Sequence, residues 1–443
     1  LVEVSRLMIG ARGVGGATSH GRLVVCYVST WAVYRPDKGA WSIDNLDPTL
    51  CTHVVYAFAG LDNNTNTIRS LNPYYDLEDN WGKGTFRKFT ALKNRHPHLK
   101  VSLAIGGWNE GSANYSRMAS TPENRRNFIA SVTGFLTKYN FDGLDLDWEY
   151  PTQRGGDPSD KQNFVLLAKE LREEFDKHGW LLTAALGVGD DVVDKAYDLK
   201  SLAKYLDYMH AMCYDLHGTW DRKVGHNAPL KSKNHKDTRT VEHALRHFLK
   251  MGAPARKLVM GVPMYGRTFI LEDPDSTTII GAPAKEQGFA GPFTREVGFM
   301  GYNEICLNLS SGGWKQFWDE ESLTPYAVQN EKVFSYDDER SIAEKVKFAM
   351  ELNLAGIMVW SIDTDDFHGS CVSSNGSVST NYPLMKTIST TITEVLKERQ
   401  ESGDVQKDHN ETDKQDEQNE IDGSGSEVIN KFSSNAEKYR TAF

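Results

Sequence analysis

The sequence lacks several features that would place the chain in familiar classes. No apolar run approaches the ~18 residues that a membrane-spanning helix requires, and the longest runs, such as 354–360, have the length of strands. There is no HExxH or CxxC motif, and the 13 histidines do not cluster, so we expect no metal centre and no cofactor. The Gly-rich segment 1–21 is not flanked by the strand and helix of a phosphate-binding loop, and we expect a flexible leader there.

An excess of positive charge is absent too. The net charge is −10, and segment 401–426 alone holds nine acidic residues against two lysines, which accounts for −7 of it. The remaining body is nearly balanced, so neither a nucleic acid nor an anionic membrane is implied as a partner. Residues 392–443 are expected to form an acidic polar tail or linker that is mostly disordered. Because the chain opens without Met, we expect a processed protein or a segment excised from a longer chain with further domains.

Cysteine is scarce but present. The five cysteines are Cys26, Cys51, Cys213, Cys306 and Cys371. One free thiol and two pairs can be arranged in many ways, so the residue count leaves the pairing open. Five N-x-S/T sequons occur, at Asn63, Asn114, Asn308, Asn375 and Asn410. Together with enough cysteines for two disulfides, they favour a secreted or luminal protein.

Eight short apolar runs alternate with helical patterns along most of the chain. The predicted strands are 23–28, 53–58, 101–105, 143–148, 181–186, 208–214, 258–262 and 356–360. The predicted helices include 122–139, 159–178, 240–251 and 338–353. This alternation predicts an α/β fold, a (β/α)8 TIM barrel, with a doubly wound open sheet as the alternative. The barrel is expected over 22–265 and 337–391. The Gly-, Thr- and aromatic-rich segment 266–336, between strands seven and eight, is expected to be a small α+β insertion domain.

The run Gly143-Leu-Asp-Leu-Asp-Trp-Glu149 carries the clearest chemical signal. In a strand, Asp145, Asp147 and Glu149 share one face, roughly 6.5–7 Å apart from one to the next. Carboxylates this close repel one another, so at least one should have a raised pKa. A protonated carboxyl beside an ionised one is the arrangement that a general acid needs near neutral pH.

Aromatic and polar side chains recur where the other predicted strands end. In a β/α barrel these ends form the active site. Trp108 follows the third strand, Tyr214 and Asp215 the sixth, Tyr265 and Arg267 the seventh, and Trp360 ends the eighth. Aromatic rings beside carboxylates suit a carbohydrate, whose C–H faces stack on the rings and whose hydroxyls bond to the carboxylates.

At these residues the sequence resembles a known family. The segment 142–151 resembles the signature of glycoside hydrolase family 18, the chitinases, in a form closest to those of arthropods. Segments 100–108, 212–218 and 356–366 resemble three further family motifs in the same order, and the resemblance spans roughly residues 22–390.

The resemblance implies an endo-chitinase that cleaves β-1,4-linked N-acetylglucosamine with retention of configuration, assisted by the acetamide of the substrate. Glu149 would be the general acid and base, Asp147 and Asp145 would support it, and Tyr214 and Asp215 would orient the acetamide. Chitin and chitooligosaccharides would be the partners. The residues implied to bind the substrate are Tyr27, Trp31, Phe58, Trp81, Trp108, Tyr150, Met212, Trp220, Tyr265, Arg267 and Trp360. The implied disulfides are Cys26 with Cys51 and Cys306 with Cys371, which leaves Cys213 as a buried thiol.

Two other functions fit the same motifs. A chitooligosaccharide-binding lectin on this fold would bind oligomers without cleaving them, although lectin-like relatives usually lose the acid that is present here as Glu149. An endoglycosidase acting on N-glycans is the other alternative. The several tryptophans, which suit a long linear polymer, disfavour it.

Overall fold

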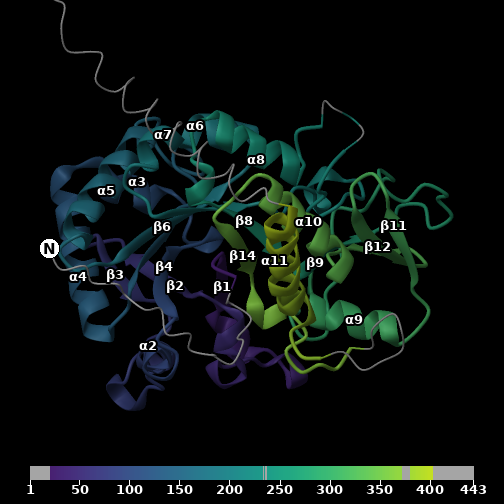
Figure 1. The fold of residues 1–443 in the computed structure, drawn as a ribbon, viewed down its shortest axis with the longest axis horizontal. Helices are drawn as coiled ribbons and strands as arrows, with labels where there is room; N and C mark the ends of the chain where they lie inside the picture. The colour runs from purple at the N-terminus through teal and green to yellow at the C-terminus, as the bar shows by residue number, and fades with distance from the viewer. Residues whose placement is uncertain (1–19, 233, 235–236, 372–379, 403–443) are drawn as a thin grey trace, which may run out of the picture. The chain divides into compact units, whose positions relative to one another are not determined.

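Eight parallel strands close into a barrel. The computed structural model describes residues 20–232, 234, 237–371 and 380–402. The barrel strands are β1 (Leu23–Ser29), β2 (His53–Asp62), β4 (Lys100–Gly106), β5 (Gly143–Asp147), β6 (Leu181–Gly187), β7 (Tyr208–Met212), β8 (Leu258–Pro263) and β14 (Gly356–Trp360). They pair in this order, and β1 closes the ring because it pairs with both β2 and β14 (Figure 1). The predicted (β/α)8 fold is confirmed.

Helices follow the barrel strands along the chain. They are α1 (Pro73–Asp76), α2 (Thr85–Arg95), α3 (Ala113–Ser120), α4 (Pro122–Tyr139), α5 (Asp160–Phe175), α6 (Asp190–Ala196), α7 (Leu199–Leu202), α8 (Val241–Lys250), α10 (Glu339–Glu351) and α11 (Pro383–Ser402). Helix α4 coincides with the predicted range 122–139. It begins there because Thr121 caps it, accepting from the backbone N–H of Asn124 at 3.2 Å, and because Pro122 fits the first helical position.

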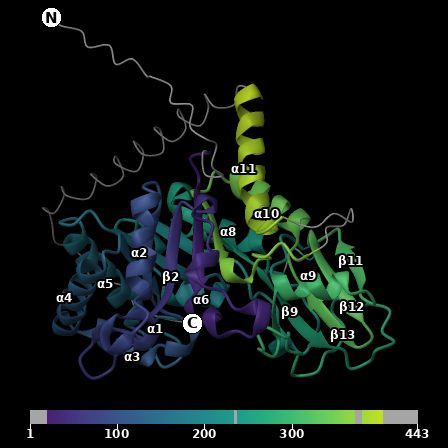
Figure 2. The ribbon, with the colours of Figure 1, turned by 90° about the horizontal axis from the view of Figure 1, so that it is seen from below.

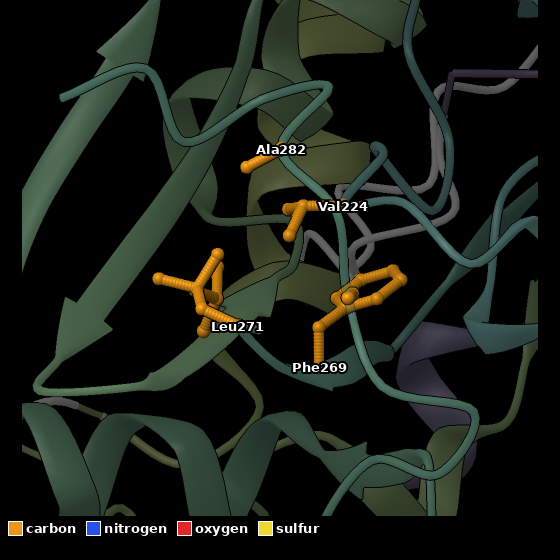
Figure 3. Packing of buried hydrophobic residues seen from close by; sticks show 6 residues of the cluster. Val224, Phe269, Leu271 and Ala282 are labelled. Atoms are coloured by element: carbon orange, nitrogen blue, oxygen red, sulfur yellow. The ribbon is translucent and has the colours of Figure 1, made fainter. Parts of the chain in front are cut away.

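The chain between β8 and α10, where an insertion was predicted, contains a second sheet and a helix. Its elements are β9 (Tyr265–Ile270), β10 (Phe299–Gly301), α9 (Tyr302–Ser310), β11 (Lys315–Asp319), β12 (Thr324–Gln329) and β13 (Lys332–Ser335). The strands form an antiparallel sheet in the order β10-β9-β13-β12-β11, to the right of the barrel helices α4 and α5 in Figure 2. Phe269 and Leu271 bury their side chains together with Val224 and Ala282 (Figure 3). Since Val224 lies between β7 and α8, a barrel loop contributes to the core of the insertion.

One strand was not expected from the sequence. β2 runs to Asp62, beyond the predicted end at 58, and pairs antiparallel with β3 (Thr67–Ser70). The turn between them is held by Asp62, whose carboxylate accepts the backbone N–H groups of Asn64 and Thr65 at 3.0 and 2.9 Å. β3 is only four residues long, and Ile68 is its one apolar residue. Its pattern is therefore too short to predict a strand.

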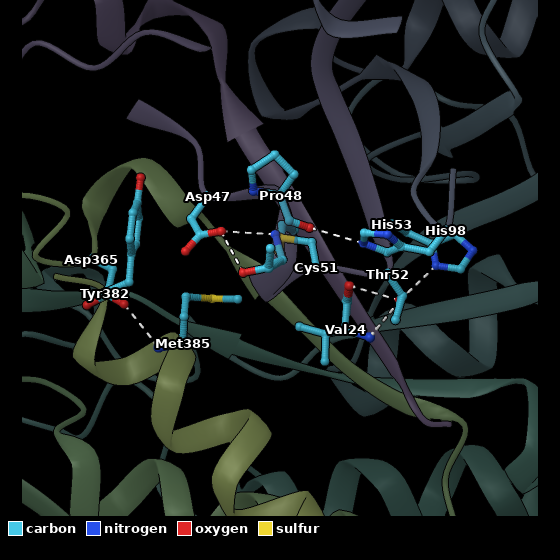
Figure 4. Close-up of a disulfide and its surroundings, with 12 residues drawn as sticks. Val24, Asp47, Pro48, Cys51, Thr52, His53, His98, Asp365, Tyr382 and Met385 are labelled. Atoms are coloured by element: carbon cyan, nitrogen blue, oxygen red, sulfur yellow. Dashed lines mark hydrogen bonds between the residues drawn. A yellow bond between two sulfur atoms is a disulfide. The ribbon is translucent and has the colours of Figure 1, made fainter. Parts of the chain in front are cut away.

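Two disulfides fasten the barrel, with the pairing that the family resemblance implies. Cys26 in β1 is bonded to Cys51, just before β2, and the segment around this bond is held by hydrogen bonds such as that from Thr52 to the Val24 carbonyl (Figure 4). Cys306 in α9 is bonded to Cys371, which follows β14. Cys213 is buried outside both bonds.

The C-terminal helix continues past the boundary placed from the sequence. The tail was expected from residue 392, but α11 runs to Ser402, and Ile388 and Ile392 are buried on it. Helical spacing of apolar residues therefore continues further than the polar composition suggested. The chain divides into compact units at 1–393 and 394–443. The predicted leader, apart from its last two residues, and segment 403–443 lie outside the described residues. Among the described helices, none has the length and apolar character needed to cross a membrane.

Candidate active site

Three acidic side chains lie along the inner face of β5 and its extension. Asp145, Asp147 and Glu149 are 0%, 4% and 9% exposed. Trp148 lies on the opposite face, where its indole N–H donates to Ser112 Oγ at 2.6 Å. The predicted alternation of an acidic and an apolar face is therefore confirmed.

Two glycines let the end of β4 approach these acids closely. Gly106 and Gly107 have φ values of 117° and 85°, and the N–H of Gly107 donates to the Asp147 carbonyl at 2.9 Å. A Cβ atom on Gly106 would collide with that same carbonyl. The chain can therefore turn outward here and present Trp108 beside the acids only because both positions lack a side chain.

Asp145 is held by side chains from three other strands. Tyr27 in β1 and Thr183 in β6 each donate a hydroxyl to it at 2.6 Å. His210 in β7 places Nδ1 2.8 Å from the Tyr27 hydroxyl and 3.3 Å from Asp145. These contacts satisfy a polar side chain in a site that is closed to water.

Thr183 and His210 were missed in the sequence analysis, although a signal for both was present. His210 precedes Met212 by two residues and so shares its face of the strand. Thr183 is a polar residue in an otherwise apolar strand, and it pairs in register with Asp145. The register between strands, which a single strand's pattern does not contain, identifies Thr183 as a partner of Asp145, whereas His210 reaches it only in the folded barrel.

Asp147 occupies the middle of the row. Burial, followed by the charges of Glu149 and Asp145, raises the pKa of Asp147 well above its ordinary value. Its Oδ1 atom is buried and has no hydrogen-bond partner among the described residues. A buried polar atom without a partner is costly unless a ligand supplies one, so this oxygen is a candidate acceptor for a substrate N–H.

Glu149 lies two residues beyond the end of β5. Burial raises its pKa from 4.5 to about 7, with a hydrogen bond from Tyr150 and the charge of Arg154 opposing the shift and Asp215 adding to it. A carboxyl group with this pKa can hold a proton at neutral pH and still release it to a leaving group, as general acid catalysis requires.

Aromatic rings pack around Trp360 at the end of β14. Its ring centroid lies 5.7 Å from those of Tyr27 and Phe58 and 6.2 Å from that of Trp31. Trp31 stays 47% exposed. Residues from β1, β2, β14 and the turn η1 (Thr30–Tyr34), which follows β1, therefore form one aromatic cluster, in which Trp31 is exposed.

A second group of side chains is built around Asp215. This carboxylate accepts hydrogen bonds from the Tyr265 hydroxyl at 2.7 Å and from Arg267 Nε at 2.8 Å. Tyr214 packs edge-on against Tyr265, with 6.1 Å between centroids. The Arg267 guanidinium lies 5.2 Å from the ring centroid of Trp220. The predicted residues Tyr214, Asp215, Tyr265 and Arg267 therefore lie in one group, and Arg267 links this group to Trp220.

The remaining predicted residues differ in how closely they join this group. Met212 is half-buried at the last position of β7, and Tyr150 bonds to Glu149. Trp108 is 58% exposed and has the Arg154 guanidinium 3.5 Å from its ring centroid. Trp81 is 94% exposed on the turn η5 (Asp79–Trp81), and within the described ranges no ring contact joins it to the other aromatics. Its predicted place in a cleft has no contact to support it.

A group of potential metal ligands, Cys306, Asp366 and Cys371, lies elsewhere in the described chain. Its two sulfur atoms are already bonded to each other. It therefore offers a cation no thiolate, and we assign no metal to it.

Comparisons with known proteins agree with this geometry. The family model described as "Glycosyl hydrolases family 18" matches residues 23–365. A Drosophila melanogaster protein named "Probable chitinase 2" is 54% identical over 391 residues, which cover 83% of this chain and 80% of that protein. The crystal structure of Ostrinia furnacalis Group IV chitinase is 45% identical with a TM-score of 0.80 and covers 84% of this chain and 100% of that one. A structure of human YKL-39, described as a pseudo-chitinase with retained chitooligosaccharide binding properties, is 35% identical with a TM-score of 0.75 and covers 84% and 99%. From the matched family model and these likenesses, the chain belongs to glycosyl hydrolase family 18.

Proposed function

We propose that this protein is an endo-acting chitinase that hydrolyses β-1,4-linked N-acetylglucosamine polymers with retention of configuration. The observation that carries the proposal is the complete acidic row, in which Glu149 can hold a proton near neutral pH. The names of the insect relatives, both chitinases, agree with it.

The proposed reaction has two steps. Glu149 donates its proton to the glycosidic oxygen while the substrate's acetamide oxygen attacks the anomeric carbon, so that the glycosidic bond breaks and an oxazolinium ion forms. Glu149, now a carboxylate, then takes a proton from water as that water attacks the same carbon. The ring of the intermediate opens, and the product leaves as the β-anomer.

The other acids would serve the acetamide. Asp147 would accept the acetamide N–H and balance the positive charge of the oxazolinium ion, a role that its unpaired buried oxygen suits. Asp145, bonded to Tyr27 and Thr183, would support Asp147 from the next position on the same face of the strand. Tyr214 and Asp215 would orient the acetamide.

The aromatic surface would bind the sugars of the chain. Trp360 would form the floor beneath the reacting sugar, and Trp108 and Trp220 would stack on sugars beside it. The exposed fractions of the latter two, 58% and 57%, leave ring surface available for a polymer. Trp31, in contact with Trp360, would continue the surface outward.

We expect kcat/KM on chitohexaose to fall as the pH rises above about 7. The acid must be protonated for the first step, and a raised pKa keeps Glu149 protonated up to that pH but not beyond it. Rates measured between about pH 4 and pH 9 would place this limb of the profile. A rate that stays constant to the alkaline end would contradict the assignment of the acid.

The rival function is that of a chitooligosaccharide-binding lectin. The human YKL-39 structure favours it, since that relative shares the fold and is described as a pseudo-chitinase that retains chitooligosaccharide binding. The two functions differ in one measurable respect, because a lectin leaves the oligomer intact.

Incubation with chitohexaose, with products and anomers followed over time by NMR, decides between them. Early dimers and trimers in the β form support a retaining endo-chitinase. Early α products would contradict retention, and single sugars released from one end would contradict endo action. An intact hexamer that binds by calorimetry would establish the lectin function.

We further propose that the protein is secreted. Two disulfides in a chain of this length are typical of an oxidising compartment. Of the sequons in the described residues, Asn63 is exposed and could carry a glycan, whereas the Asn308 side chain already donates to the Glu304 carbonyl at 2.9 Å.

A further inference from the structure

Arg154 contacts both the proposed acid and an aromatic platform. Its Nη1 donates to the backbone carbonyl of Glu149 at 2.9 Å, and its Nη2 donates to the backbone carbonyl of Trp108 at 2.9 Å. The same guanidinium lies 3.5 Å from the centroid of the Trp108 ring. One side chain therefore fixes the ring and two backbone segments relative to each other.

The loop that carries Arg154 has an unusual backbone. Arg154 and Thr152 have φ values of 51° and 69°, a region that residues other than glycine rarely adopt, least of all a β-branched one. Asp160, which is fully buried, holds the loop by accepting from the backbone N–H groups of Thr152 at 3.1 Å and Asp157 at 2.7 Å. Costly local conformations that the surroundings maintain are common at functional sites.

The guanidinium also covers one face of the Trp108 indole. Trp108 is nevertheless 58% exposed, so ring surface remains for a sugar. A sugar that stacks there would contact a ring whose position depends on Arg154, and Arg154 is bonded to the residue that donates the proton.

We propose that Arg154 is a positioning residue that couples sugar stacking on Trp108 to the placement of Glu149. The inference rests on the proposed chitinase function. It follows that a sugar on Trp108 raises kcat in addition to lowering KM. Part of the sugar's binding energy holds Glu149 in place. Arginine suits this task better than lysine, since its planar fork can stack and donate two hydrogen bonds at once.

The test is a double-mutant cycle on chitohexaose with Arg154→Met, Trp108→Ala and the double variant. We expect Arg154→Met to lower kcat about tenfold, since small displacements of a catalytic group are costly. The double variant should lose little more than the worse single variant, because the two residues act together. Arg340→Met is the matched control. Arg340 stacks on Trp318 at 3.7 Å in the insertion region, outside the proposed site, and its loss should leave kcat unchanged.

The variant Arg154→Lys and the pH profile distinguish a positioning role of Arg154 from a merely structural one. The positive charge of Arg154 lowers the pKa of Glu149, so Arg154→Met should move the alkaline limb of the profile to higher pH. Arg154→Lys keeps the charge but not the fork, so it should leave that limb in place and still lower kcat.

Provided that the wild-type protein cleaves the hexamer, three results would overturn the inference. They are additive losses in the cycle, a change in KM alone, and an alkaline limb that stays in place in Arg154→Met although its melting temperature is normal. Wild-type protein that leaves the hexamer intact would instead refute the proposed function, and this inference with it.

Discussion

Replacing Glu149 with glutamine is expected to lower hydrolysis of chitohexaose by about 10³-fold or more while leaving binding of the hexamer measurable by calorimetry. Glutamine has nearly the same size and fills the same buried site, but it has no proton to donate to the glycosidic oxygen. A variant that keeps activity within tenfold of wild type would refute Glu149 as the acid. Glu286→Gln, which neutralises an exposed carboxylate paired with Arg222, is the control and should behave as wild type.

The same substitution should stabilise the protein at alkaline pH. The pKa of Glu149 rises from 4.5 in the unfolded chain to about 7 in the folded one, so the folded state binds more protons between these values and stability falls as pH rises through them. Above pH 7 the difference amounts to roughly 3 kcal/mol, which the neutral amide avoids. Thermal melts at about pH 8 should show a more stable variant, and melts at about pH 4 should show no difference. A loss of activity with a raised melting temperature cannot be ascribed to unfolding.

The row of acids could be predicted from the sequence because its geometry is local. Side chains alternate along any strand, so Asp145, Asp147 and Glu149 share a face whichever strands flank them. The flanking apolar residues Leu144 and Trp148 make that face part of a buried strand. The barrel was predictable for a similar reason, since each apolar run and each helical stripe is readable within its own segment.

The partners of the row were not predictable in the same way. Thr183 and His210 reach Asp145 from two other strands. The pairing register places Thr183 there, whereas His210 lies two strands away in β7 and reaches Asp145 only in the folded barrel. Arg154 looks like an ordinary charged loop residue in the sequence, yet the turn that follows β5 folds it back over Trp108. Trp81 is the reverse case, because its residue type suggested a sugar platform and the described part of the chain gives it no ring partner in the site.

Replacing Asp147 with asparagine is expected to lower kcat on chitohexaose by about 10²- to 10³-fold. Asparagine is close in size, but it removes the negative charge that would balance the oxazolinium ion. Its amide can also turn an N–H toward the substrate's acetamide N–H, where an acceptor is needed. KM should change less than kcat, since the charge develops only as the reaction proceeds.

The pH profile supplies an independent measure of the same variant. The charge of Glu149 adds to the raised pKa of Asp147, and such repulsion is mutual, so each carboxyl, when ionised, makes it harder for the other to lose its proton. Asparagine removes that repulsion, and the alkaline limb of kcat/KM should move to lower pH. The shift is opposite in direction to that expected for Arg154→Met, which removes a positive charge from the same surroundings.

Asp142→Asn provides the matched control on the same segment. Asp142 precedes β5, accepts the backbone N–H of Val101 at 2.8 Å and pairs with Lys93 at 2.9 Å, so its replacement should cost stability without moving the pH profile. If Asp147→Asn behaved like this control, with kcat within tenfold of wild type and an unmoved limb, Asp147 would be a structural acid. The acetamide would then need another acceptor. If both properties change together, Asp147 acts on the proton of Glu149 as well as on the substrate's acetamide, and the two acids work as one unit on one face of one strand.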